Sequence, residues 1–274
     1  MHPTVERILN KRGMARAAFE SACAEACRML GDQQDISARM QVSAALASAP
    51  GGRLCDVGGS ISAYLVVCHV LGTEVTVVDT LPYAEPREKE RIQEIAEEVR
   101  RRLELFDRIG IRIDRSDAYE MSLPADHFDA AVAFETMEHF PHSPKPVLDK
   151  MAKSLKPGGR LCLSVPNLAR IEMRFRVLAG RTAHENFAEF FREGYPHLGH
   201  HREYTLSEFE AIPAMLGLET VQVFSVNATY ESRKRKNASQ RFMIDLEERY
   251  GLGDRVLPPT WRKHVWLEAR KASS

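Results

Sequence analysis

The strongest indication of the fold is the stretch Leu54-Cys-Asp-Val-Gly-Gly-Ser-Ile-Ser62. Residues 53–57 form an apolar run typical of a buried strand, and this run leads directly into a turn of small residues. An apolar stretch over 61–71 predicts a helix after the turn, and residues 74–79 predict a second strand. Strand, helix and strand in this order indicate a βαβ unit, in which a ligand can approach the backbone of the small-residue turn closely.

Strands and helices continue to alternate after this unit. The heavily charged segment 85–108 has apolar residues at helical spacing, which predicts a long amphipathic helix. Further helices are expected up to Lys156-Pro157-Gly158-Gly159 and over Ser207–Leu216. Further strands are expected over 111–115, 128–134, 160–165, 219–226 and 264–270. This order predicts an α/β fold with a seven-stranded, mostly parallel sheet that has helices on both faces.

Two segments stand apart from the alternation. Residues 14–48 are rich in Ala, Met and Leu at helical spacing, so we expect an N-terminal helical extension over 1–49 before a domain over 50–274. Residues 167–205 are rich in His, Arg and aromatic side chains and follow the fifth strand. Open α/β sheets bind ligands beyond the carboxyl ends of their strands, so this segment is expected to be a lid over a substrate.

Composition narrows the classes of partner. The 274 residues include 38 Lys and Arg against 38 Asp and Glu, so the chain lacks the net positive charge that drives nonspecific binding of nucleic acid. Two basic segments, 170–181 and 231–241, lack the interleaved aromatic residues of a base-stacking platform. The composition therefore does not favour nucleic acid as a partner.

Targeting and redox features point to the cytoplasm. The first residues carry charge throughout and no window approaches 18 apolar residues, so neither secretion nor membrane insertion is expected. The cysteines are odd in number and scattered among apolar residues, which predicts reduced thiols packed in the core rather than disulfides or a metal site. These residues are Cys23, Cys27, Cys55, Cys68 and Cys162.

Acidic residues follow successive predicted strands. Asp79 ends the second strand, where the acceptor for the ribose hydroxyls of a nucleotide-like ligand would lie; the alternative role is a helix N-cap. Asp117 and Ala118 follow the third strand, and Glu135-Thr-Met-Glu-His-Phe140 follows the fourth. The carboxyl ends of parallel strands share one edge of a sheet, so these residues are expected to surround one site.

Together with the small-residue turn and Lys156-Pro157-Gly158-Gly159, this ordered set resembles the class I S-adenosylmethionine-dependent methyltransferases, in particular the group of ubiquinone-biosynthesis and type 11 enzymes. The resemblance covers about residues 50–226. It implies a Rossmann-like sheet, S-adenosylmethionine as cofactor, and methyl transfer to an oxygen or nitrogen atom of a small or medium-sized metabolite. We expect no nucleic-acid partner, and a homodimer is one expectation for the assembly.

The resemblance also implies roles for the strand-end residues. The methionine part of the cofactor would lie against Asp56, Gly58, Gly59 and Ser60. The ribose would lie against Asp79 and Thr80, and the adenine against Asp117 and Ala118. Glu135 would lie beside the transferable methyl group.

The turn departs from the family pattern Asp-x-Gly-x-Gly-x-Gly. Ser60 and Ser62 occupy the places of the second and third glycines. A hydroxymethyl group is a small polar intrusion, which predicts weakened or reoriented cofactor binding. A non-catalytic, cofactor-binding partner subunit is therefore an alternative to the enzyme.

Three further residues are expected on the acceptor side of the site. His139 is a candidate general base because imidazole titrates near neutrality, although it would equally serve as a helix cap. Glu138 would orient this imidazole. His200 would lie against the acceptor; it belongs to the pattern His-x-x-x-Tyr-Thr, which precedes the helix before the sixth strand. The alternative is that the histidines of this lid segment are ordinary surface residues.

The same residues support a second enzymatic hypothesis. Glu135-x-x-Glu138-His139 with a distant His200 resembles the metal-binding set of the small-RNA 3′-end 2′-O-methyltransferases, in which two Glu and two His hold a divalent ion. A metal-assisted RNA methyltransferase is therefore the competing prediction. Because the Glu-x-x-Glu-His pattern also occurs in metal-free relatives, the favoured prediction has no metal.

Overall fold

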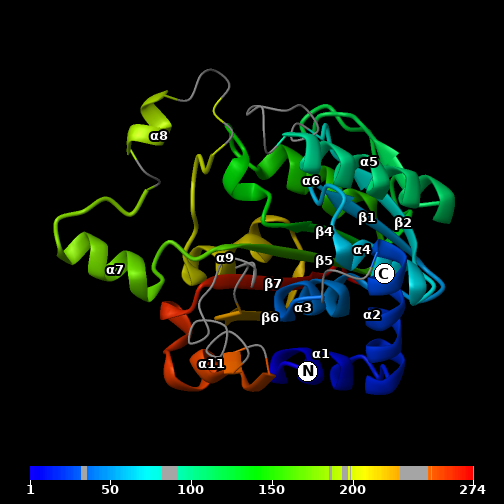
Figure 1. Cartoon of the computed structure of the whole chain (residues 1–274), viewed down its shortest axis with the longest axis horizontal. Coiled ribbons are helices and arrows are strands. Elements are labelled where there is room, and N and C mark those ends of the chain that lie inside the picture. The colour runs from blue at the N-terminus through cyan, green and yellow to red at the C-terminus, as the bar shows by residue number, and fades with distance from the viewer. Residues whose placement is uncertain are drawn as a thin grey trace.

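The computed structural model describes residues 1–31, 36–81, 92–184, 187–192, 197, 199–228, 246–247 and 249–273. Within them, seven strands form one sheet in the order β3-β2-β1-β4-β5-β7-β6 (Figure 1). The strands are β1 (Arg53–Val57), β2 (Glu74–Val78), β3 (Arg112–Asp114), β4 (Phe128–Phe134), β5 (Leu155–Pro166), β6 (Glu219–Val226) and β7 (His264–Arg270). Among these strands, β7 alone runs antiparallel to its neighbours, β5 and β6. The predicted mostly parallel, seven-stranded sheet is confirmed.

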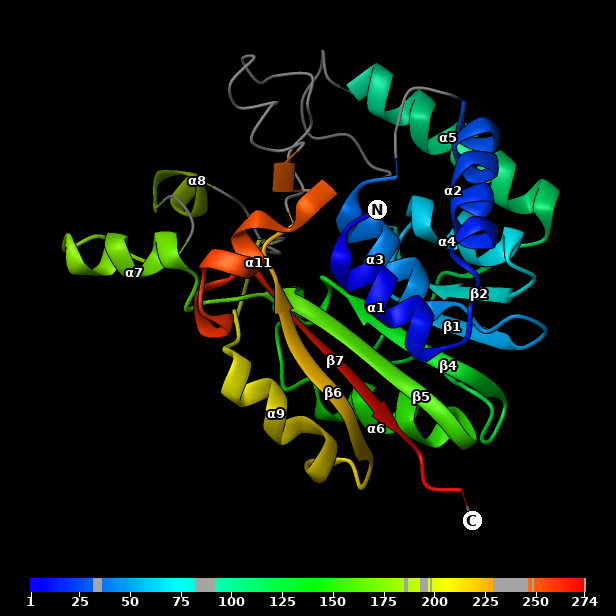
Figure 2. The same ribbon diagram turned by 90° about the horizontal axis from the view of Figure 1, so that it is seen from below.

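Helices cover both faces of the sheet (Figure 2). One face packs against α1 (Pro3–Lys11), α2 (Arg16–Leu30), α3 (Ala38–Ala47), α4 (Ala63–Val70) and α5 (Ile92–Ile109). The other face packs against α6 (Lys145–Ser154) and α9 (Leu206–Met215). A short α11 (Leu252–Val256) and a 3₁₀ turn, η4 (Pro259–Trp261), precede β7. No helix in the described part of the chain is long and apolar enough to cross a bilayer.

The N-terminal helices belong to the same core as the sheet. The helical pattern over 14–48 is present as the two helices α2 and α3, and α1 is an additional helix that the charged N-terminal sequence did not indicate. Its apolar residues Val5, Ile8 and Leu9 have helical spacing and are buried in one cluster with Leu54 of β1. The division of the chain at residue 49 stays a prediction.

The fifth strand begins earlier than its apolar pattern indicates. Helix α6 ends at Ser154, and β5 starts at Leu155 instead of residue 160. The register against β4 shifts between Phe128 and Ala130, so the Lys-Pro-Gly-Gly segment is an irregular part of the strand. Gly159 has no room for a side chain, because a Cβ atom would lie 2.8 Å from the carbonyl oxygen of Lys156.

The lid after β5 leaves the sheet and returns to it. Its helices α7 (Ile171–Leu178) and α8 (Phe187–Arg192) stand apart from the body of the molecule in both views (Figures 1 and 2). The returning chain is held beside the end of β5, where the Leu168 amide donates to the Tyr204 carbonyl over 2.9 Å. Thr205 then begins α9 with a reciprocal capping box to Glu208. The carboxyl ends of the strands and the end of the lid therefore meet.

A buried ion pair connects the C-terminal end of α1 to the strands β7 and β6. Arg12 lies 2.9 Å from the carboxylate of Glu268 in β7, and their side chains are 10% and 4% exposed. Gln222 of β6 donates to the same carboxylate over 2.6 Å. A buried charge is stable only when it is paired, so this contact ties the first helix to the end of the chain.

Arg12→Ala is expected to lower the free energy of unfolding by about 3 kcal/mol, because the buried Glu268 carboxylate then loses its close cation and keeps the hydrogen bond from Gln222 and the Arg160 guanidinium at 3.9 Å. Arg16→Ala is the matched control: Arg16 pairs with Glu20, but its side chain is 54% exposed. This control should change stability by about 1 kcal/mol at most. Urea denaturation measures both, and equal effects of the two variants would contradict the role of the Arg12 pair.

Candidate active site

Two adjoining cavities lie at the carboxyl ends of β1, β2 and β4. The larger, of about 310 Å³, is lined by the small-residue turn, by α3 and by Arg102 of α5. The smaller, of about 180 Å³, is lined by the residues that follow β2, β3 and β4. Gly58 and Glu135 line both cavities and so mark the boundary between them. This is the edge of the sheet where the strand-end residues were expected to meet.

The glycine turn is built for close approach. A Cβ atom on Gly58 would lie 2.1 Å from Thr136 Cγ2, and one on Gly59 would lie 2.0 Å from a carboxylate oxygen of Asp56. Asp56 is fully buried, and neither of its oxygens has a hydrogen-bond partner among the described residues. Burial, together with the charge of Asp79, raises the pKa of Asp56 well above its usual value. The bare turn lets a ligand approach its backbone closely, whereas Asp56 is buried and lines neither cavity.

Asp79 joins the turn to the end of β2. One of its carboxylate oxygens accepts from the Ser60 amide over 2.9 Å and the other accepts from the Leu81 amide over 2.6 Å. Burial raises the pKa of Asp79 above its usual value. Asp79 lines the smaller cavity with Thr80, Asp117 and Ala118, as a site for ribose and adenine requires. The structure therefore brings the predicted ribose and adenine residues together.

Glu135 is held by three segments that are distant in the sequence. Its carboxylate lies 3.0 Å from Arg39 Nη1 of α3 and 3.0 Å from His264 Nδ1 of β7, and it accepts from the Ser164 hydroxyl of β5 over 2.9 Å. Burial opposes its ionisation, but the charges of His264 and Arg39 and the hydrogen bonds from His264 and Ser164 lower the pKa of Glu135 to about 2. Glu135 is therefore a fixed anion in the wall that the two cavities share.

Arg39, Ser164 and His264 are site residues that the sequence did not reveal. Arg39 is buried and lines the larger cavity with Met40 and Ser43 of the same helix. The N-terminal extension therefore forms part of the cavity wall. An arginine within a helix made mostly of apolar residues was the available signal, and it does not identify a partner 96 positions away in the sequence.

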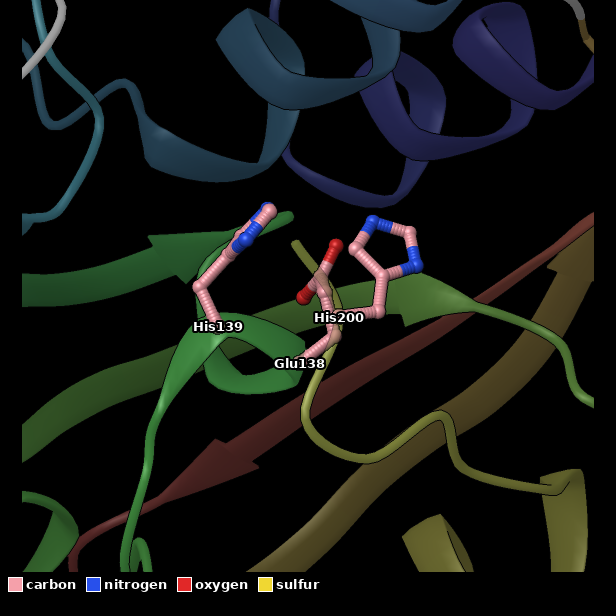
Figure 3. A group of neighbouring side chains, drawn as sticks. All are labelled: Glu138, His139 and His200. Carbon is pink, nitrogen blue, oxygen red and sulfur yellow. The ribbon is translucent and has the colours of Figure 1, made fainter. Parts of the chain in front are cut away.

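Glu138, His139 and His200 form a second group beside the smaller cavity. Glu138 and His139 lie in the 3₁₀ turn η2 (Met137–His139) directly after β4, and His200 comes from the returning end of the lid. The three side chains point to the same side, with the Glu138 carboxylate between the two rings (Figure 3). The rings of His139 and His200 have centroids 4.8 Å apart. The structure thus brings together the three residues predicted on the acceptor side.

The surroundings of this group fix its side chains. The His139 Nδ1 atom lies 3.2 Å from the Gly199 carbonyl oxygen, and the His200 Nδ1 atom lies 3.0 Å from the Glu203 carboxylate. Glu138 is 1% exposed, and its Oε2 atom has no hydrogen-bond partner among the described residues. Burial and the nearby charge of Glu135 raise the pKa of Glu138 well above its usual value.

The ligand atoms of Glu138, His139 and His200 lie within 4.8 Å of one another, close enough to hold a metal ion. Glu135 is not in this group, because its carboxylate is engaged by Arg39, Ser164 and His264. The four-residue metal set suggested by the sequence is therefore not assembled, whereas three of its members are. The basic segment 231–241 lies outside the described residues.

The comparisons with known proteins agree with this geometry. A family described as "Methyltransferase domain" matches residues 32–223. The chain belongs to this family. It is a class I S-adenosylmethionine-dependent methyltransferase, and S-adenosylmethionine is its cofactor. The bare glycine turn and the Asp79 carboxylate, which line the two cavities, fit that cofactor.

Solved structures show the same fold at low sequence identity. YcgJ from Bacillus subtilis is 17% identical, with a TM-score of 0.50 over 86% of this chain and 98% of that one. An S-adenosylmethionine-dependent methyltransferase from Mesorhizobium loti is 16% identical, with a TM-score of 0.48 over 84% and 95%. Geranyl diphosphate C-methyltransferase from Streptomyces coelicolor is 12% identical, with a TM-score of 0.48 over 83% and 76%. No curated protein matches the chain.

The two serines in the turn of this methyltransferase have different environments. Ser60 has a φ of 54°, in the left-handed region that favours glycine. Ser62 precedes α4 with a φ of −67°, and its hydroxyl donates to the Gly59 carbonyl over 2.5 Å. Ser60 is therefore strained, whereas Ser62 supports the turn.

We predict opposite effects of replacing these serines by glycine. Ser60→Gly relieves strain of about 1 kcal/mol and should leave the methyltransferase as stable as before or more stable. Ser62→Gly removes a hydrogen bond and should lower the free energy of unfolding by about 1 kcal/mol. Chemical denaturation measures both variants, and an equal loss of stability in the two would disprove the strain at Ser60.

Asp79→Asn should weaken binding of S-adenosylmethionine by about 10-fold or more, because an uncharged amide accepts fewer and weaker hydrogen bonds from a ribose. Asp126→Asn is a control, since Asp126 is exposed and lies outside both cavities. Isothermal titration calorimetry measures the affinity, and thermal melting checks that Asp79→Asn is folded. An unchanged dissociation constant would contradict the ribose contact.

Proposed function

We propose that this enzyme methylates an oxygen or nitrogen atom of a small or medium-sized metabolite, with Glu138, His139 and His200 activating the acceptor. The observation that carries the proposal is the convergence of these side chains next to the smaller cavity, which His139 itself lines. The predicted cofactor-binding residues lie around the two cavities. The side chains of Glu138, His139 and His200 lie at the edge of the sheet that the end of the lid reaches.

Methyl transfer requires both the residues proposed to bind the cofactor and those proposed to bind the acceptor. S-adenosylmethionine supplies a methyl group whose carbon–sulfur bond breaks as the acceptor atom bonds to the methyl carbon, and the acceptor's proton leaves to a base or to water. The glycine turn and Asp79 are proposed to bind and orient the cofactor, a positioning effect that lowers the barrier of an in-line transfer. Glu138, His139 and His200 are proposed to bind the acceptor and promote loss of its proton.

The contacts of the lid favour a metabolite over RNA. Arg170 pairs with Glu203 at 2.7 Å, and Arg174 donates to the Ala169 carbonyl and lies over the ring of Trp261. These basic side chains are engaged within the protein, whereas an RNA-binding surface presents its cations to phosphates. No disulfide joins the five cysteines, and Cys55, Cys68 and Cys162 are buried. A cytoplasmic location and a homodimer remain predictions from the sequence.

His139→Ala should lower kcat by about 10²- to 10⁴-fold and leave cofactor affinity nearly unchanged, because the imidazole is proposed to act on the acceptor. His200→Ala should mainly raise the acceptor's KM. His69→Ala is the control, because His69 lies in the last turn of α4 and lines neither cavity.

A panel of hydroxyl- and amine-bearing metabolites with radiolabelled cofactor provides the assay, and calorimetry provides the cofactor affinity. Wild-type kinetics in both His139→Ala and His200→Ala would show that methyl transfer proceeds by positioning alone. That result would contradict the proposed role of this group.

A further inference from the structure

We propose that a cavity of about 450 Å³ at the amino ends of the strands binds a small metabolite through a carboxylate or phosphate group of that metabolite. Its walls are formed by residues 12–14 and 48–52 together with Asp129 and Arg160, and we call it the amino-end cavity. The inference goes beyond the proposed function, because neither the cofactor nor the methyl acceptor is assigned to this edge of the sheet.

The amino-end cavity is separate from the cofactor residues. Gly52 directly precedes β1 and lines the amino-end cavity, whereas Gly58 directly follows β1 and lines both cavities of the candidate active site. Asp129 lies near the beginning of β4, and Arg160 lies in β5 beside Ala130 of β4. Because β1, β4 and β5 are parallel, the two sites lie at opposite ends of the same strands.

Two guanidinium groups meet in the wall of the amino-end cavity. Arg12 and Arg160 both donate to the Ser48 carbonyl oxygen, over 3.3 Å and 2.9 Å, so their charged groups are neighbours. In the described part of the chain both pair with the same carboxylate, Glu268, which lies 2.9 Å from Arg12 and 3.9 Å from Arg160. Two cations therefore share one anion, and this wall carries a net positive charge.

Arg160 has hydrogen-bond donors left for a ligand. A guanidinium carries several N–H donors. Arg160 donates from Nη2 to Ser48, whereas its Nε atom has no hydrogen-bond partner among the described residues. Burial and the neighbouring charge of Arg12 lower the pKa of Arg160 below its usual value, so the folded chain compensates this charge incompletely. An oxyanion that accepts from Arg160 would complete the compensation.

The acidic residue in the same cavity does not cancel the positive charge. Asp129 Oδ2 accepts from Lys156 Nζ over 2.7 Å and from the Arg53 amide over 2.8 Å. Lys156 thus neutralises Asp129, and the charge of the arginine pair remains.

A similar arrangement on the surface shows why burial matters. Arg53 and Arg112 also share one carboxylate, that of Glu74. Their side chains are 43% and 64% exposed, so water solvates the excess charge. The side chains of Arg12 and Arg160 are only 10% and 20% exposed. An excess cation is therefore more costly in the wall of the amino-end cavity than at Glu74, and an anionic ligand would offset that cost.

The chemistry of the walls indicates the class of ligand. Planar guanidinium groups bind carboxylates and phosphates through paired, charge-assisted hydrogen bonds. Gly13 and Gly51, which also line the cavity, have no atom within 4 Å of the place where a Cβ would lie. These turns leave room for the rest of an organic molecule, and the volume of the cavity falls within the range that small-molecule sites occupy.

The binding test uses the full chain saturated with S-adenosylhomocysteine, the demethylated cofactor, so that the probes cannot bind in the cofactor cavities. Calorimetry with inorganic phosphate and with acetate, at constant ionic strength, should show one site with a dissociation constant in the millimolar range. Arg160→Gln should weaken binding of both anions by about 10-fold or more, because it removes a charged donor. Arg53→Gln is the matched control, since it removes a positive charge at the start of β1 without touching the cavity wall, and it should bind both anions as the wild type does.

A second pair of variants tests the cavity without changing an arginine. Pro50 is exposed and lines the cavity. Pro50→Glu adds a tethered carboxylate to the wall and should weaken phosphate binding by about 10-fold or more, because the tethered group competes for the same cations. Pro50→Gln has nearly the same shape without the charge and should bind phosphate as the wild type does. Thermal melts establish that each variant is folded.

The outcomes decide both the site and the ligand class. Tighter binding of phosphate than of acetate would indicate a phosphorylated metabolite and the reverse order a carboxylic acid, and either supports the inference. Absence of binding of both anions overturns it. So does an affinity that is unchanged in folded Arg160→Gln or, if that variant does not fold, in Pro50→Glu. Because methyl transfer is not measured, the result is independent of the proposed function.

Discussion

The ionised carboxylate of Glu135 is the constraint on which the site depends. A charge at this depth is stable only with partners, and Arg39, Ser164 and His264 supply them from α3, β5 and β7. Glu135 lines both cavities, so the same contacts that stabilise the charge also fix the wall between them. Helix α3 of the N-terminal extension is thereby part of the cavity wall.

The direction in which Glu135 points separates the two halves of the site. Its φ of 53° lies in the left-handed region directly after β4, and its carboxylate is not among the ligand atoms of Glu138, His139 and His200 that lie within 4.8 Å of one another. Two glutamates three positions apart therefore have opposite electrostatic environments. Cationic partners lower the pKa of Glu135 to about 2, whereas burial and the charge of Glu135 raise the pKa of Glu138. Such divergence between neighbouring carboxyl groups is a common mark of an active site.

The sequence predicted the features that depend on local pattern and missed those that depend on distant pairs. Apolar runs and turn residues place β1, β4, β6 and β7 at their observed bounds, because strands buried in a sheet need such runs. The strand-end acids follow from the order of the strands. By contrast, Arg39 and His264 meet Glu135 across long stretches of chain, and no local pattern encodes a pairing of that kind. The sequence spacing alone placed Glu135 in one metal-binding set with Glu138. In the structure Glu135, which has a left-handed backbone conformation, is not in the group that contains Glu138.

The serines of the cofactor turn show how the family's architecture persists without two of its glycines. Ser60 adopts the left-handed conformation that a glycine would adopt freely, and its amide donates to Asp79, which is itself held at the end of β2. The strain of one residue is offset by a hydrogen bond to a half-buried carboxylate, a bond stronger than one between neutral groups. At position 62, where the family has a glycine, the Ser62 hydroxyl donates a hydrogen bond to the Gly59 carbonyl and so supports the turn. The amide contact to Asp79 therefore persists without a glycine at position 60, whereas Gly58 and Gly59 have no room for a side chain.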